Sequence, residues 1–458
     1  MNQMNRLIAV VFLMSLLAGS LWAQQATTGV DGFKFVAPME IAVGSDNNFL
    51  VDRTNPNEKL LVLSLPPSVQ PAAPDIRPKM LDDKIMTIKL PKMAYQHNGK
   101  RHEFVTTWVP EFEIFKQNSD QNGMNQQAMV SFNYYITRNL QIFIGDYFQT
   151  TKDPARTLNN VFLLLPRSPY RSNDVHGTLE FQPTPVTNVA ISYDTAWTKF
   201  GQTNQFQTQI LDSRSAGYAL TLTRLLGQRQ RLSFRYSVFK VTPINQQKTF
   251  DDGVDVTGSF VYPIHAFTGQ YRIQVNPNLL TSFSGGIVRL DSGLNYTAGG
   301  TIYKRFGYFW VGGGYTRSLA FQNSTGTRVA SGLNGNGFYD VVQIRVTGQP
   351  TRKTAVLFDT TMSRGATSRL IDSNEALLGR VRLDYRVSDR NVLFTSWESF
   401  QQTRNTYVNA PLSRNRFMMG IEISFATDTQ RRADPLNEDT QYVALTDHGR
   451  RRKSPEDN

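Results

Sequence analysis

The sequence predicts an all-β protein, an antiparallel transmembrane β-barrel of about 18 strands with both termini in the periplasm. Segments of roughly ten residues alternate apolar with polar side chains, and the connections between them are mostly short and long in turn. After about residue 84 no segment has a helical period, and beyond residue 23 no run of about 18 apolar residues occurs. A bundle of membrane-spanning helices is therefore excluded.

The last alternating segment is the clearest of these. Between 416 and 425 one face is apolar and consists of Phe417, Met419, Ile421, Ile423 and Phe425. The segments 231–238, 267–275 and 380–388 repeat the pattern, with charged residues in the middle of the other face. Soluble sandwiches also alternate, but their strands are usually about five or six residues long, whereas a tilted membrane strand needs about 9–11. The strand lengths favour a membrane barrel.

Turn-forming residues define the connections between the strands. Asn, Gly, Pro and basic residues predict short turns at 97–101, 137–139, 183–186, 227–230, 276–278, 304–307, 349–353 and 388–391. Longer connections are expected at 52–82, 117–127, 151–173, 199–212, 243–264, 291–293, 319–337, 363–374 and 402–412. These connections predict about 18 strands, an even number as bacterial barrels require. The connection 291–293 is too short for the pattern, and about 16 strands is the alternative if 36–50 and 84–92 lie outside the barrel.

The first residues resemble an export signal. Arg6 is followed by the apolar run Leu7–Ala18, and the small residue Ala23 suits cleavage before Gln24. The run is too short to span a bilayer, so an uncleaved anchor helix is the less favoured alternative. The expected organisation is a signal peptide at 1–23, a barrel at 24–425 with strands from about residue 36, and a polar periplasmic tail at 426–458.

The closing strand carries a second signal. Gly420, Ile423 and Phe425 resemble the terminal pattern by which the outer-membrane assembly machinery recognises bacterial barrels. That pattern usually ends the protein, whereas here residues 426–458 follow it. Arg450–Lys453 lie in this extension among acidic residues, so we expect a solvated tail and no nucleic-acid binding.

Composition excludes several classes of function. The chain has no cysteine, which rules out disulfide scaffolds and thiolate metal sites, and its 11% aromatic content argues against a disordered protein. Of the five histidines only His97 and His102 lie close in sequence, and they flank a predicted turn. No phosphate-binding loop and no serine elbow occurs. We therefore expect no metal, no cofactor, no catalytic residue and no enzymatic activity.

Two long connections contain stretches that a plain pore does not need. Residues 52–82 hold the apolar run Leu60–Leu65 and several prolines, which cannot sit in a closed strand ladder. This segment is expected to be an extended external loop, with a partner-binding arm or a lumen segment as alternatives. Residues 151–173 hold the apolar run Val161–Leu165, which something must cover. Packing on the rim is favoured over a constriction of the lumen, and a partner is the third option.

Charge on the predicted inner face gives the candidate site. By alternation, eight arginines face away from the apolar stripes: Arg231, Arg235, Arg272, Arg345, Arg380, Arg382, Arg386 and Arg416. Arginine in a water-filled channel binds carboxylates and phosphates, so these residues are candidates for setting selectivity. The alternative is that they pair with lumen carboxylates such as Asp384 and Glu422 and only keep the wall rigid. The formal charge of +12 keeps an anionic solute in consideration.

The layout of the N-terminal half resembles a known family. Val43–Phe49 lies on the first expected strand, Arg101–Phe104 opens a later one, and Asn133–Leu140 forms a hairpin. The chain thereby resembles, over most of 36–425, the outer-membrane β-barrel porin family often associated with exopolysaccharide secretion loci in Gram-negative bacteria. The resemblance implies a barrel embedded in outer-membrane lipids, and more loosely an export role with a polysaccharide or an export complex as partner.

The sequence therefore predicts a porin-like channel of the bacterial outer membrane for polysaccharide or anionic solutes. The first alternative is a structural or surface-interaction barrel whose lumen is plugged by its loops. The second is an outer-membrane hydrolase. The solute, the direction of transport and the oligomeric state are not determined by the sequence.

Overall fold

The computed structural model describes residues 32–35, 37–47, 83–153, 169–201, 213–243, 263–290, 293–319, 338–365, 375–402 and 412–424. Within these ranges the chain forms strands joined by turns, together with a 3-10 helix at Ser119–Gln121. No helix in this part of the chain is long and apolar enough to cross a membrane. The predicted signal at 1–23, the segment 52–82, the run Val161–Leu165 and the tail 426–458 lie outside the described residues.

The described strands form one sheet. They are β1 (Gly32–Phe35), β2 (Met39–Asp46), β3 (Asp83–Lys89), β4 (Met93–Asn98), β5 (His102–Phe115), β6 (Gly123–Thr137), β7 (Leu140–Thr151), β8 (Tyr170–Thr184), β9 (Thr187–Phe200), β10 (Ser213–Gly227), β11 (Gln230–Pro243), β12 (Ile264–Asn276), β13 (Leu279–Leu290), β14 (Gly293–Phe306), β15 (Phe309–Leu319), β16 (Phe338–Gly348), β17 (Thr354–Gly365), β18 (Glu375–Arg386), β19 (Asn391–Gln402) and β20 (Leu412–Ile423).

The first four of these strands are two barrel strands, each with a short interruption. β3 and β4 both pair with β5, and they continue each other across 90–92, where the N–H of Leu90 donates to the carbonyl of Pro110 at 2.9 Å. β1 pairs with β4 and β2 with β3, so β1 and β2 are related in the same way. The sheet therefore has 18 barrel strands, as predicted. The alternative of 16 strands is wrong, because β2 and β3 belong to the barrel.

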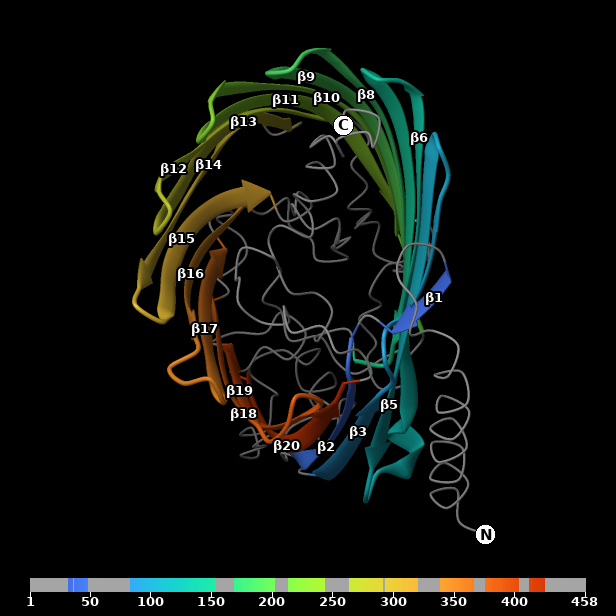
Figure 1. Ribbon diagram of the computed structural model, residues 1–458, viewed down its shortest axis with the longest axis vertical. Helices are drawn as coiled ribbons and strands as arrows, with labels where there is room; N and C mark the ends of the chain where they lie inside the picture. The colour runs from blue at the N-terminus through green and yellow to red at the C-terminus, as the bar shows by residue number, and fades with distance from the viewer. Residues whose placement is uncertain are drawn as a thin grey trace, which may run out of the picture.

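The barrel closes where its first and last strands meet. β2 pairs antiparallel with β20, from Met39 opposite Ile423 to Asp46 opposite Arg416. In Figure 1 these two strands lie side by side at the bottom of the view, and β8–β13 form the arc across the barrel from them. Closure pairs the two strands that would otherwise be the edges of an 18-stranded sheet, which is what a β structure needs in order to span lipid.

The connections alternate in length as predicted. All eight short turns are present at one end of the barrel, and the long connections join the strands at the other end. β6 begins a few residues earlier than expected, since the side chain of Asn122 accepts a hydrogen bond from the backbone of Phe115 and ends the loop there. The short connection at 291–292 is real: Leu290 pairs with Gly293, whose φ of +124° permits the tight turn.

The two faces of the sheet differ in polarity. Large apolar side chains at every second position are exposed, such as Leu220 and Leu222 on β10 and Phe234 on β11. The alternate positions, for example Thr221 and Arg235, therefore face the lumen. This arrangement, apolar outside and polar inside, reverses that of a soluble barrel.

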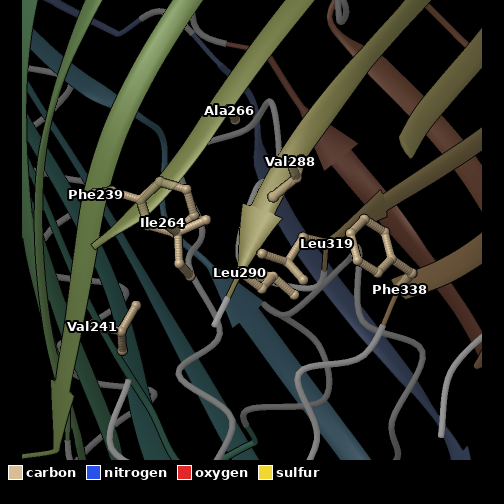
Figure 2. Close-up of a cluster of buried hydrophobic side chains, with 8 residues drawn as sticks. All are labelled: Phe239, Val241, Ile264, Ala266, Val288, Leu290, Leu319 and Phe338. Atoms are coloured by element: carbon tan, nitrogen blue, oxygen red, sulfur yellow. The ribbon is translucent and has the colours of Figure 1, made fainter. Parts of the chain in front are cut away.

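Near the end of the barrel that carries the long connections, part of the inner face becomes apolar. Figure 2 shows the buried side chains that gather there, Phe239, Val241, Ile264, Ala266, Val288 and Leu290, together with Leu319 and Phe338, which lie on the face of β15 and β16 that also carries Arg317 and Asp340. On β11–β13 the outward neighbours at this level are Lys240, His265 and Arg289. At these strand ends the polarity of the two faces is therefore inverted relative to the middle of the barrel.

Gly44 makes the closing seam close-packed. A Cβ at this position would overlap the carbonyl oxygen of Phe417 on β20, whereas a Cβ on Gly379 would meet nothing within 4 Å. We expect Gly44→Ala to lower the free energy of unfolding by about 1–3 kcal/mol, because the extra methyl forces the seam apart. Gly379→Ala is the matched control and should change it little. Urea unfolding of the refolded barrels measures both, and equal effects would contradict this explanation.

Candidate functional site

The outer surface of the barrel is apolar around its circumference. Exposed apolar side chains run from Tyr218 to Leu226 on β10, and Leu383, Leu393 and Phe417 continue the band on β18–β20. Water-soluble proteins rarely expose so large a continuous apolar surface. A closed, even-numbered antiparallel barrel with such a band is the architecture that spans the outer membrane. The chain is an outer-membrane β-barrel. The candidate site is therefore the inner wall of this porin-like barrel.

Five of the eight predicted arginines on the barrel's inner wall lie within 4.0 Å of a carboxylate, and Arg345, Arg380 and Arg416 are three of them. Arg345 lies 3.1 Å from Asp359, and Arg380 lies 3.2 Å from Glu398, each measured between a guanidinium nitrogen and a carboxylate oxygen. Arg416 lies 3.6 Å from a carboxylate oxygen of the fully buried Glu113. For these residues the structure has the arrangement of the alternative interpretation, in which arginines stiffen the wall by pairing across strands.

Arg382 binds several carboxylates at once. Its Nε donates to Asp384 at 2.9 Å, one terminal nitrogen contacts Glu422, and the other lies 3.5 Å from Glu40. The guanidinium also lies over the ring of Phe394, at 4.2 Å from its centroid. The guanidinium of Arg382 thus contacts three carboxylates, on β18, β20 and β2.

Arg414 forms the most deeply buried charge cluster, and the sequence reasoning missed it. Its guanidinium donates to the carboxylate of Asp46 at 2.7 and 2.9 Å and to that of Asp153 at 2.7 and 3.3 Å. The exposed fraction of the side chain is 7% for Arg414, 0% for Asp46 and 1% for Asp153. Asp153 lies two residues beyond the end of β7, and its side chain is held against Arg414 of β20. Alternation would have found Arg414, since it lies two residues before Arg416 on the same face.

The arginines on β11 and β12 form a different arrangement. Arg231 lies directly opposite Arg272 in the strand register, and Arg235 follows four residues farther along the same face. Arg235 is 3.8 Å from Asp194 and remains about half exposed. We call Arg231, Arg235 and Arg272 the arginine stripe. Like charges directly opposite each other in a sheet are destabilising unless another group offsets them.

Hydroxyl groups flank the arginine stripe. Thr223 and Ser233 are hydrogen-bonded at 2.9 Å on one side, and Ser282 and Thr301 at 2.6 Å on the other. Ser282 is the cross-strand neighbour of Arg272. Arg386, the remaining predicted arginine, ends β18. The stripe therefore combines cationic donors with neutral groups that both donate and accept hydrogen bonds.

A histidine cluster on β8 and β9 was not foreseen. Nδ1 of His176 contacts Asp194, and its Nε2 lies 2.7 Å from the hydroxyl of Thr178. Hydroxyl, imidazole and carboxylate in series is the connectivity of a hydrolytic triad. Thr178, however, is paired in the ladders with both β7 and β9, which occupy the backbone amides that an oxyanion hole would require. The cluster orders the inner wall instead.

Metal ligands do not gather in the described part of the chain. The rings of His97 and His102 lie 5.3 Å apart on β4 and β5. Within the described ranges no group of three or more His, Asp or Glu side chains could hold a metal ion.

The residues of the predicted assembly signal lie at the seam. A Cβ on Gly420 would overlap the carbonyl oxygen of Ile41 on β2, so this glycine allows the last strand to approach the first. Ile423 is the last residue of β20, and Phe425 lies outside the described residues. Recognition of this pattern by the assembly machinery stays a prediction.

Carboxylates and cations on the inner faces of the described strands are similar in number. The surplus of Lys and Arg lies mainly elsewhere, on the turns and on the outward-facing strand ends. Examples are Lys100 and Arg101 in the turn before β5 and Arg138 in the turn before β7, all of them exposed. The net charge of the chain therefore does not by itself make the lumen anion-selective.

Comparison with known proteins gives structural likeness only. No family model matches the sequence, and no curated protein does. One similar solved structure is the outer membrane protein OpdK from Pseudomonas aeruginosa, with 12% sequence identity, coverage of 86% of this chain and 100% of that one, and a TM-score of 0.44. Another is OccAB4 from Acinetobacter baumannii, with 8% identity, coverage of 87% of this chain and 99% of that one, and a TM-score of 0.44. A third is the siderophore receptor PirA from Pseudomonas aeruginosa, with 9% identity, coverage of 87% of this chain and 82% of that one, and a TM-score of 0.36. With values this low, the conclusions rest on the strands and side chains of this chain.

Proposed function

We propose that the barrel is a porin-like channel whose arginine stripe binds the anionic groups of a passing solute, and that acidic sugars are the solute class. The observation that carries this proposal is Arg231 opposite Arg272 on the inner face. An anion between the two guanidinium groups offsets their repulsion and accepts charge-assisted hydrogen bonds from both.

The hydroxyl pairs beside the stripe support a sugar rather than a bare anion. Thr223 with Ser233 and Ser282 with Thr301 offer hydrogen bonds of the kind that sugar hydroxyl groups exchange. A chain of acidic sugars would present a carboxylate and several hydroxyls per unit, which matches this mixture. Export of such a polysaccharide is the most specific form of the proposal.

A narrowed or plugged lumen is the second candidate, and the buried Arg414 cluster favours it. Asp153, two residues beyond β7, is held against Arg414 on the inner face of β20, and a segment that continued inward from this point would narrow the lumen. In that case the barrel would conduct little current until the segment is displaced.

Planar-bilayer recordings of the refolded barrel test both candidates. We expect a steady conductance that oligogalacturonate, an acidic sugar oligomer, interrupts at far lower concentration than a neutral maltooligosaccharide of equal length. Interruption by both at the same concentration would contradict anion binding at the stripe. Absence of conductance from a correctly folded barrel would contradict the open channel and support the plugged one.

A further inference from the structure

The outward-facing ends of β8–β13 carry a row of basic side chains. On each of β8, β9, β10, β11 and β13 one such residue belongs to the face that carries the exposed apolar band, but lies near the end joined to a long connection. All five are exposed: Arg171, Lys199, Arg214, Lys240 and Arg289. We call this row the basic belt. Its strands are consecutive in the barrel and form one arc in Figure 1.

The charges of the basic belt are not neutralised by neighbouring residues. None of the five forms an ion pair with another described residue, and no outward position of β8–β13 holds Asp or Glu. Neighbours in the belt reinforce each other, since Arg171 lies directly opposite Lys199. Outward-facing arginines on other strands differ, because Arg317 pairs with Asp340 at 3.3 Å and Arg364 with Glu375 at 3.3 Å.

The inverted polarity at the same strand ends gives the depth of the belt in the membrane. On β11–β13 the residues that alternate with Lys240, His265 and Arg289 belong to the buried apolar cluster of Figure 2. The outer face is therefore apolar below this level and basic at it. The belt lies where the barrel leaves the hydrocarbon and enters the headgroup layer, and the long connections mark this as the external side.

Aromatic side chains confirm that this level is an interface. The rings of Tyr193 and Tyr218 lie 4.9 Å apart below the belt, and Lys199 lies 5.7 Å from the ring centroid of Trp197. The hydroxyl of Tyr236 bonds Nδ1 of His265 at 2.8 Å. Aromatic residues with a polar tip concentrate at the boundary between hydrocarbon and water.

We propose that the basic belt binds the phosphate groups of a lipid in the external leaflet, whose acyl chains lie on the apolar face beneath it. A free phosphate would meet only the charges, whereas a phosphorylated lipid also covers the apolar side chains from Tyr218 to Leu226 on β10. Arginine and lysine on five of six neighbouring strands suit a headgroup that carries more than one phosphate.

Binding of fluorescent, doubly phosphorylated lipid A to the full-length barrel in uncharged detergent tests the proposal, with EDTA present to remove bridging cations. We expect the variant Arg171→Gln, Lys199→Gln, Arg214→Gln, Lys240→Gln and Arg289→Gln to bind it about tenfold more weakly or worse. The matched control removes five exposed cations at the other end of the barrel: Lys100→Gln, Arg101→Gln, Arg138→Gln, Arg229→Gln and Arg305→Gln. It should bind as the unchanged protein does.

Two further comparisons make the result decisive. Dephosphorylated lipid A should bind the unchanged barrel as weakly as lipid A binds the belt variant, and inorganic phosphate at millimolar concentration should not displace lipid A. Equal loss in the control variant, tight binding of the dephosphorylated lipid, or displacement by inorganic phosphate would each overturn the proposal. If the five-fold variant does not reach the heat-modifiable folded form, Lys240→Gln with Arg289→Gln replaces it, with an expected loss of about threefold.

Discussion

Replacing Arg414 with methionine is expected to lower the free energy of unfolding of the barrel by about 3–5 kcal/mol. The substitution removes the cation that the buried Asp46 and Asp153 share, and the methionine cannot donate the hydrogen bonds that both carboxylates accept from Arg414. Urea unfolding of the refolded protein, followed by tryptophan fluorescence, measures the loss.

Two further variants distinguish the loss of stability caused by leaving buried carboxylates without Arg414 from the loss caused by removing any ion pair. Arg364→Met removes an exposed pair with Glu375 on the outer surface, and should change the free energy of unfolding by less than about 1 kcal/mol. Adding Asp46→Asn and Asp153→Asn to Arg414→Met should recover part of the loss, because the stranded charges disappear. A triple variant no more stable than Arg414→Met would show that packing, and not charge, dominates this site.

Replacing the three residues of the arginine stripe with glutamine is expected to weaken the block of the channel by oligogalacturonate about 10- to 100-fold. Each charge-assisted hydrogen bond from Arg231, Arg235 or Arg272 contributes about 1.5–3 kcal/mol, and glutamine retains only a neutral donor. The concentration dependence of the current interruptions measures the change.

The control for the stripe is a change that leaves the net charge of the inner wall as it is. Arg345→Gln combined with Asp359→Asn removes a cross-strand ion pair of 3.1 Å without altering that charge. The block by oligogalacturonate should stay within about twofold of the unchanged channel, a difference of about 0.4 kcal/mol. If this control weakens the block as much as the stripe variant does, general disturbance of the wall explains the effect, and binding at the stripe does not.

Much of the fold followed from the sequence because a membrane strand repeats every two residues and its turns use few residue types. The alternation gave the outward faces, and the turn residues gave all eight short connections. The connection 291–293 did not fit the predicted pattern of long connections only because it is so short. Gly293 explains the short connection, since its positive φ permits a tight turn at that end of the barrel.

The ion-pair and hydrogen-bond partners of the inner-wall side chains were harder to predict from the sequence. Alternation assigns a side chain to a face of the sheet but does not say which residue lies opposite it. That Arg382 binds Glu40 depends on closure of the barrel, which joins residues at the two ends of the chain. His176 meets Asp194 only through the register of β8 on β9. Asp153 was missed altogether, since no periodicity places a residue beyond the end of a strand.

The seam of the barrel also determines where the wall is weakest. β2 has 8 residues, fewer than any strand from β5 to β20. β20 ends at Ile423, so among the described strands β1 pairs with β4 alone. Fewer ladder hydrogen bonds join the first and last strands than join β10 to β11. Local opening begins where the fewest hydrogen bonds must break, so we expect the barrel to open first between β2 and β20. The ion pair between Arg414 on β20 and Asp46 on β2 joins these two strands and stabilises the seam against opening.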